Sequence, residues 1–149
     1  MRKQLLKGLT TFGVFLSLIV ASVQAQTGYT IEANIPFDFT AGQTSLSAGV
    51  YSVRLTSEGT LLLRGIDGKK SVLLLARKAE QVATRKPARI IFNRYGDRYF
   101  LSQAFPGEAG LGSQLNPSHA ERQLAREYRL AKNNSTSQKV EVAMRLNRK

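Results

Sequence analysis

Hydrophobic and polar residues alternate over several short stretches of the chain, a pattern that predicts β-strands with one buried face. The first stretch covers residues 29–40, and Pro36 within it indicates a sheet edge or a break in the strand. A turn at residues 41–43 follows it. One face of this stretch collects Tyr29, Ile31, Ala33, Ile35, Phe37 and Phe39.

Three further strands are predicted before residue 80. Residues 48–56 alternate, with Tyr51, Val53 and Leu55 on one face. Residues 60–66 and 71–78 follow, separated by turns at 57–59 and at Asp67-Gly68. The end of the last of these strands stays open, because residues 76–84 also fit a short helical turn.

The clearest hairpin covers residues 88–105, with Gly96 and Asp97 as its loop. This loop predicts three facing pairs: Phe92 with Leu101, Ile90 with Gln103, and Arg94 with Tyr99. One face then collects Ile90, Phe92, Tyr99, Leu101 and Phe105, and the other mixes polar and apolar residues.

Residues 106–117 contain three glycines and two prolines and predict a loop. Ser118 and Glu121 then fit a capping box, which starts an amphipathic helix over about residues 118–132. Its apolar side is predicted to carry Ala120, Leu124, Tyr128 and Ala131, with Arg122, Arg126 and Arg129 on the outer side of a docked helix. A polar linker (133–138) leads to a last strand (139–147).

These elements amount to about seven strands, mostly joined by short turns, and one late helix. The fold class predicted is mainly β: an antiparallel sandwich or partly closed barrel with one C-terminal α-helix. We expect one domain over residues 26–149, with the last strand returning to pair with an early strand and cover its edge.

Residues 1–25 have the pattern of a signal peptide. Arg2, Lys3 and Lys7 precede an apolar run at 9–20, and a small-residue site ends at Ala25. The run is shorter than the ~20 residues that a membrane-spanning helix needs. We therefore expect cleavage after Ala25, no integral membrane span afterwards, and a periplasmic or extracellular location in a bacterium.

Cysteine is absent from the chain, which excludes disulfides, thiolate metal sites and a thiol nucleophile. The leader carries three of the 22 basic residues and none of the ten acidic ones, so the processed chain has a net charge of +9. A charge of this sign attracts polyanions, and it also keeps a protein soluble.

No catalytic, cofactor or metal site is predicted. His119 is the only histidine, and it lies at the predicted first turn of the helix with no local serine or acid beside it to complete a hydrolase site. The acidic residues are scattered singly rather than at ligand-like spacing. We expect a protein that is not an enzyme, with a hydrolase that uses His119 as an alternative.

The basic residues around the hairpin give the one positive indication of binding. Tyr95 and Tyr99 lie among them, and this mixture is typical of surfaces that follow phosphates and stack on bases. The same residues also fit a solvated strand edge that charge protects from self-pairing. The candidate polyanion-binding residues are Arg85, Lys86, Arg89, Arg94 and Arg98.

Four segments together resemble a family of short, exported, uncharacterised bacterial proteins. They are IPFDF at 35–39, SAGVYSV at 47–53, FNRYGDRYFL at 92–101 and ERQLA at 121–125. Family members usually have proline where this chain has Ser47. The resemblance implies export and brings no activity, ligand or catalytic residue with it.

The sequence thus leads us to expect an exported, non-enzymatic, envelope-associated or secreted binding or accessory protein. Its partner would be an anionic envelope polymer or another envelope protein. A polyanion-binding module that uses the basic hairpin is the main alternative.

Overall fold

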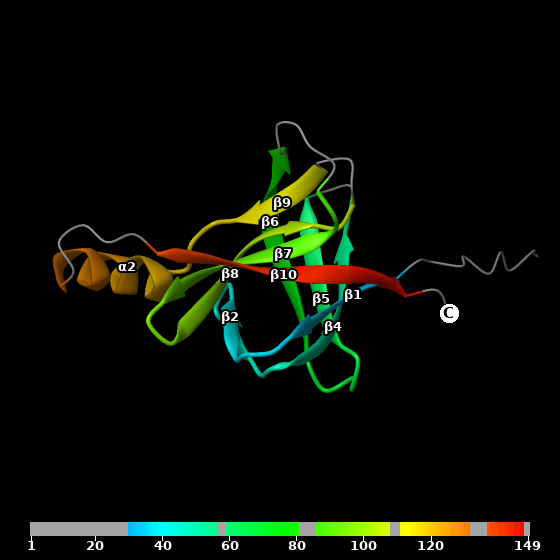
Figure 1. Ribbon diagram of the computed structural model, residues 1–149, viewed down its shortest axis with the longest axis horizontal. Coiled ribbons are helices and arrows are strands. Elements are labelled where there is room, and N and C mark those ends of the chain that lie inside the picture. Colours follow the sequence, from blue (N-terminus) through cyan, green and yellow to red (C-terminus); the bar gives the residue numbers. More distant parts are fainter. Residues whose placement is uncertain (1–29, 57–58, 81–85, 108–110, 132–136, 148–149) are drawn as a thin grey trace, which may run out of the picture.

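The computed structural model describes residues 30–56, 59–80, 86–107, 111–131 and 137–147 (Figure 1). The predicted signal peptide, the turn residues 57 and 58 and most of the predicted linker lie outside these ranges. In chain order the described elements are β1 (Thr30–Ile35), β2 (Phe39–Ala41), β3 (Thr44–Leu46), β4 (Gly49–Leu55), β5 (Thr60–Gly65), β6 (Ser71–Glu80), β7 (Arg89–Tyr95), β8 (Arg98–Phe105), β9 (Leu111–Leu115), α2 (His119–Ala131) and β10 (Gln138–Asn147).

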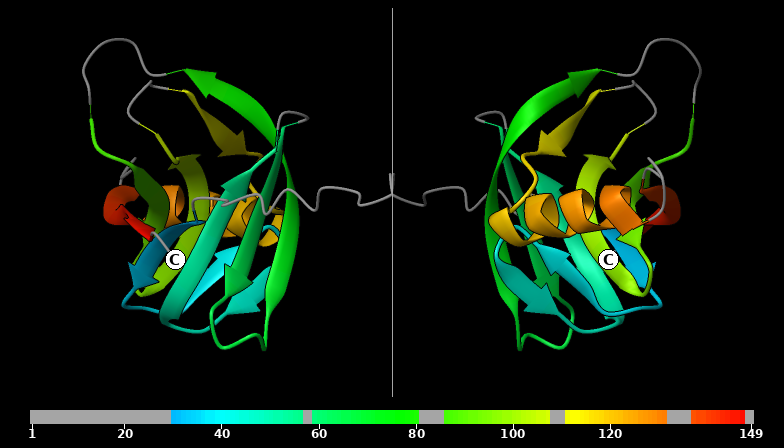
Figure 2. Two further views of the ribbon diagram at one scale, coloured as in Figure 1. Left: turned by 90° about the vertical axis from the view of Figure 1, so that its right-hand side faces the viewer. Right: turned by 90° about the vertical axis from the view of Figure 1, so that its left-hand side faces the viewer.

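Eight of the strands close into an antiparallel barrel, in the order β1-β4-β5-β6-β9-β8-β7-β10 and back to β1. Figure 2 shows these strands curving around a common interior. β10 completes the ring by pairing with β1 on one side and β7 on the other. The mainly β fold is therefore confirmed, and so is the return of the last strand to an early one.

The first predicted stretch, residues 29–40, divides into two strands at Pro36. β1 ends at Ile35, Pro36 is exposed, and the chain resumes as β2, which pairs with β3 and runs parallel to β8. The predicted break at Pro36 is confirmed, because proline has no N–H to continue a ladder. Between the two strands, the ring of Phe37 stacks on that of Tyr99 with centroids 3.8 Å apart.

Apolar side chains fill the inside of the barrel, as the alternation predicted. Phe92 is fully buried, and the Phe37 and Phe39 rings pack nearly perpendicular to its ring with centroids 5.2 and 5.3 Å away. The buried core consists of Ala33, Ile35, Phe39, Ala41, Leu46, Tyr51, Val53, Leu61, Leu63, Leu74, Ile90, Phe92, Leu101, Ala104, Leu115 and Met144.

The predicted strand count of about seven is too low. β2 and β3 have only three residues each, and β9 lies inside the segment predicted to be a loop. β9 pairs with β6 and β8 and so belongs to the barrel wall. Residues 76–80 continue β6 as a strand, so the helical alternative fails there, while residues 81–84 lie outside the described part.

The predicted register of the hairpin is correct near its loop and wrong further away from it. Phe92 faces Leu101 and Arg94 faces Tyr99 as predicted, but Ile90 faces Ala104 instead of Gln103. Ser102 is the extra residue of a β-bulge, which moves every later pair by one position. Ala104 therefore points into the barrel, and Phe105 lies on the outer face opposite Arg89.

α2 begins and ends close to its predicted bounds, and the amide of Glu121 donates to the Ser118 hydroxyl at 3.1 Å, as a capping box requires. The predicted packing of its apolar side holds only in part. Leu124 and Tyr128 are half-buried, whereas Ala120 and Ala131 are exposed. Figure 1 shows why: α2 extends away from the barrel and adjoins it at one end.

Candidate binding site at one end of the barrel

A cavity of about 330 Å³ lies at the end of the barrel where β4 and β6 finish and β9 starts. Cavities of roughly this size and above are typical of small-molecule sites, and the mouths of barrels are a common place for them. We call it the end cavity. Its lining residues are Leu55, Thr56, Gly59, Arg77, Lys78, Ala79, Glu80, Leu111, Gly112 and Ser113.

Strand pairing holds the walls of the end cavity in place. In the β6–β9 ladder, Lys78 faces Ser113 and Ala79 faces Gly112. The turn after β4 is tied to the same wall, because the Ala76 amide donates to the Gly59 carbonyl at 2.9 Å. The cavity is therefore enclosed by hydrogen-bonded backbone on two sides.

Ser113 is the unusual residue of this cavity. Its side chain is 1% exposed, and its Oγ has no hydrogen-bond partner in the part of the chain that the structure describes. A buried hydroxyl left unpaired costs about 1–3 kcal/mol. Ser113 is among the residues that line the cavity, so its buried hydroxyl lies in the cavity wall.

The charged residues of the lining give the cavity a positive balance. Arg77 and Lys78 are cationic, Glu80 is anionic, and all three are exposed. Leu55, Ala79 and Leu111 supply apolar lining. The arrangement suits a small, mostly apolar molecule with one polar or anionic end.

Gly112 allows the wall beside Ser113 to form. The Phe105 ring and the Ala104 carbonyl lie so close that a Cβ at position 112 would overlap both. On the outer face, the Arg89 guanidinium sits 4.8 Å from the centroid of the same Phe105 ring. Glycine thus lets an aromatic ring lie directly on the β9 backbone.

Sequence reasoning missed this site because residues 106–117 look like a loop. The signal that could have found it is short: Leu111, Ser113 and Leu115 alternate with Gly112 and Gln114. Two glycines and two prolines around that stretch hide the period.

The opposite end of the barrel has a larger hollow of about 550 Å³, between the start of β4 and the turn from β5 to β6. Two of the polar side chains that line it have partners within the chain. The Tyr51 hydroxyl donates to the Ser47 carbonyl at 2.6 Å, and Asp67 accepts the Lys69 amide at 3.1 Å. No buried, unpaired polar atom of the described residues lines this hollow, so we prefer the end cavity.

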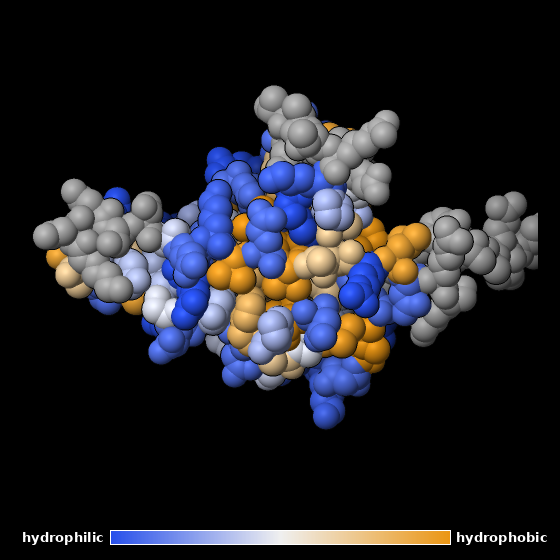
Figure 3. Space-filling model, viewed as in Figure 1, coloured by the Kyte–Doolittle hydropathy of each residue, from blue (hydrophilic) through white to orange (hydrophobic). Residues whose placement is uncertain are grey.

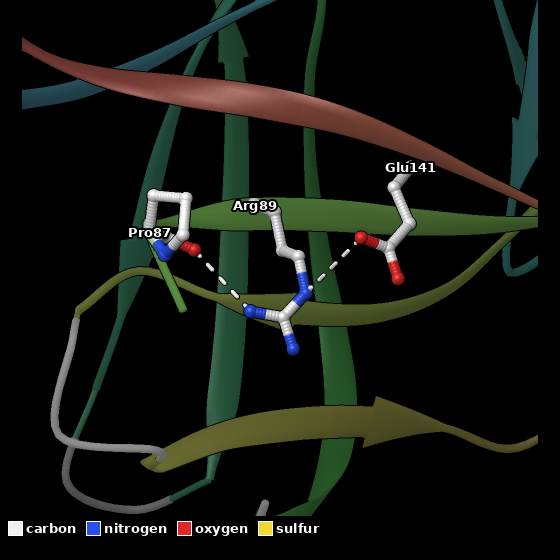
Figure 4. A network of polar contacts seen from close by, with 3 residues as sticks. All are labelled: Pro87, Arg89 and Glu141. Carbon is white, nitrogen blue, oxygen red and sulfur yellow. Dashed lines mark hydrogen bonds and ion pairs between the residues drawn. The ribbon is translucent and has the colours of Figure 1, made fainter. Parts of the chain in front are cut away.

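The structure does not bring the basic hairpin residues to one surface. Arg85 lies outside the described residues, and Lys86 is exposed. Arg89 is 4% exposed, donates to the Pro87 carbonyl at 3.2 Å and lies 3.5 Å from the Glu141 carboxylate (Figure 4). Figure 3 shows hydrophobic surface on this side of the barrel, between hydrophilic side chains. Arg89 therefore links β7 to β10 on the outside of the barrel through its ion pair with Glu141.

Arg94 and Arg98 lie on opposite faces of the hairpin. Arg94 faces Tyr99, whose ring its guanidinium approaches to 5.5 Å, and it donates to the Gly96 carbonyl at 2.7 Å. Arg98 faces Tyr95 and approaches the Phe100 ring to 5.5 Å. Polyanion binding by this hairpin stays a prediction, with Lys86, Arg94 and Arg98 as the residues within reach of solvent.

His119, the residue of the alternative hydrolase, is exposed at the first residue of α2, and no hydrogen bond or ion pair joins its side chain to another described residue. The residues that the structure describes contain no group of three or more His, Cys, Asp or Glu side chains that could hold a metal ion. None of their helices is long and apolar enough to cross a membrane.

Glu121 joins α2 to the barrel. Its side chain is 4% exposed and accepts a hydrogen bond from the side-chain amide of Asn93 at 2.8 Å. Burial raises the pKa of this carboxyl above the usual value for glutamate, and hydrogen bonds from Asn93, Ser118 and Tyr95 oppose part of the rise. Two of the segments that carried the family resemblance therefore meet at one carboxylate.

Stability should depend on pH through Glu121. Because its folded pKa is raised, the folded protein holds the proton more tightly, and stability falls as pH rises through that pKa. We expect Glu121→Gln to remove this fall, measured as urea midpoints between about pH 4 and pH 7. Glu127→Gln, on the exposed part of the same helix, is the control. Parallel curves for wild type and Glu121→Gln would contradict the assignment.

Comparison with known proteins adds no relative to this picture. No protein-family model, no curated protein and no solved structure matches the chain. The function of this chain therefore has to be inferred from its own sequence and geometry.

Proposed function

We propose that the protein is an exported, non-enzymatic binding protein whose end cavity takes a small apolar molecule with a polar or anionic end. The observation that carries this proposal is the buried Ser113 hydroxyl, which lines a mostly apolar cavity without a partner among the described residues. A group that costs stability in the free protein is explained if a ligand bonds it.

The interior of the barrel is filled by side chains, which favours ligand binding at the end of the barrel over binding at its centre. Phe92, Leu61 and Leu63 are fully buried there and fill the space between the walls. Export is a part of the proposal that rests on the sequence of residues 1–25. Recovery from an envelope or culture fraction of a protein that begins at Gln26 would support it, and an uncleaved cytoplasmic product would contradict it.

Ser113→Ala tests the cavity directly. We expect the free protein to gain about 1 kcal/mol of unfolding free energy, because the unpaired hydroxyl is gone, and to bind its ligand roughly fivefold more weakly. Stability follows from urea unfolding, and affinity from displacement of the fluorescent dye anilinonaphthalene sulfonate by decanoate or decanol. Loss of affinity together with a gain in stability is a result that general damage to the fold does not produce.

Three further variants sharpen this test. Ser113→Leu should fill the cavity and abolish displacement by both compounds, whereas Ser71→Ala, at an exposed serine of β6 outside the cavity lining, should change nothing. Lys78→Gln should weaken decanoate more than decanol, because only decanoate has a charge. Equal dye displacement in wild type and Ser113→Leu would refute the end cavity as the site.

A further inference from the structure

The outer face of β6 carries two exposed leucines that the fold does not explain. Leu73 and Leu75 are 66% and 86% exposed, while Val72, Leu74 and Ala76 between and beside them point into the barrel. β6 pairs with β5 over Ser71–Leu75 and with β9 over Ala76–Glu80, so Leu73 and Leu75 lie on the half of β6 that pairs with β5. Exposed apolar side chains gathered in one place indicate an interaction surface.

Strand register assembles these leucines with arginines. Leu73 faces Leu62 across the β5–β6 ladder, and Leu62 in turn faces Arg54 across the β4–β5 ladder. Arg64 lies two residues beyond Leu62, and Arg77 two residues beyond Leu75, on the same outer face. We call this surface the leucine face; it consists of Arg54, Leu62, Arg64, Leu73, Leu75 and Arg77.

The arginines of the leucine face are available for an external partner. All three are exposed, and the ion pair recorded within the described residues joins Arg89 and Glu141 elsewhere. β6 lies across the barrel from β10, as Figure 2 shows, and α2 adjoins β7 rather than this wall. The leucine face is therefore not covered by any described element.

We propose that the leucine face docks the protein onto an anionic lipid membrane. Leu73 and Leu75 enter the boundary between headgroups and acyl chains, and Arg54, Arg64 and Arg77 bind lipid phosphates around them. A lipid surface adapts to side chains that protrude from a convex wall, and guanidinium groups match phosphate geometry. A second copy of the chain is disfavoured as the occupant, because it would bring two sets of three arginines together.

Flotation with lipid vesicles tests the docking, with protein that begins at Gln26 so that the apolar leader is absent. This protein contains every described strand and α2. We expect it to bind vesicles of phosphatidylglycerol mixed with phosphatidylcholine and to bind phosphatidylcholine alone weakly. Leu73→Thr with Leu75→Thr should lower the affinity about tenfold or more. Replacing Arg54 or Arg64, neither of which lines the end cavity, with glutamine should cost roughly fivefold for each.

Leu130→Thr is the matched control, because Leu130 is 85% exposed on α2, away from this wall. It should bind like wild type. The chain contains no tryptophan, so Leu75→Trp supplies a single reporter whose emission should shift to the blue on vesicles. An unshifted emission, or full binding by the double leucine variant, would overturn the proposal.

A polyanion partner gives a different pattern. If the arginine variants lose both vesicle binding and heparin retention while the double leucine variant keeps both, the surface binds polyanions and the membrane proposal is wrong. The docking is also separable from the end cavity. Ser113→Leu should abolish dye displacement and leave vesicle binding unchanged, so failure of one proposal is distinguishable from failure of the other.

Discussion

Gly112→Ala is expected to lower the unfolding free energy of the barrel by about 3 kcal/mol, the size typical of forced overlap in a packed wall. A Cβ at this position would meet the Phe105 ring and the Ala104 carbonyl inside normal contact distance. Backbone cannot give way without breaking the β8–β9 ladder, in which Ala104 faces Ser113. Urea unfolding followed by circular dichroism measures the loss.

Gly107→Ala is the control for that measurement. Nothing lies within 4 Å of a Cβ at Gly107, so this change should be neutral within about 0.5 kcal/mol. Adding Phe105→Ala to Gly112→Ala should restore only part of the stability, because the clash with the Ala104 carbonyl remains. If Gly112→Ala were as stable as wild type, β9 would not lie against β8 as described, and the wall that carries Ser113 would be misplaced.

The sequence predicted the parts of this fold that local alternation determines. β4 and the halves of the first stretch have one apolar face each, and that face lies inside the barrel: Ala33, Ile35, Phe39, Tyr51 and Val53 are all buried. The break at Pro36 and the turn at Gly96-Asp97 were also predictable from the sequence. Proline lacks an N–H, and glycine accepts the backbone angles of a tight turn. In each case the cause lies within a few residues.

The parts that sequence did not predict depend on contacts between distant segments. Ser102 looks like any strand residue, yet the bulge there turns Phe105 outward, onto Gly112 and beneath Arg89. Arg89 in turn is buried by a ring and a carboxylate that no local pattern places beside it. The candidate site was missed for the same reason, because Ser113 becomes a cavity residue only when β9 pairs with β6.

Phe92→Ala is the second change with a large expected effect, a loss of about 3–5 kcal/mol of unfolding free energy. Phe92 is fully buried inside the barrel, where the Phe37 and Phe39 rings pack nearly perpendicular to its ring. Removing the ring deletes these contacts and leaves a cavity that paired strands cannot close. The loss would take a large share of the 5–15 kcal/mol that stabilises a typical domain.

Phe92→Ala also separates the barrel centre from the end cavity. Phe92 faces Leu101 and Val140, and none of these residues lines the end cavity. Decanoate should therefore displace the dye with wild-type affinity wherever the variant is folded, while the urea midpoint falls. Phe92→Leu, which keeps most of the volume, should lose roughly 1 kcal/mol. Loss of dye displacement in folded Phe92→Ala would instead place the natural site in the interior of the barrel and not at its end.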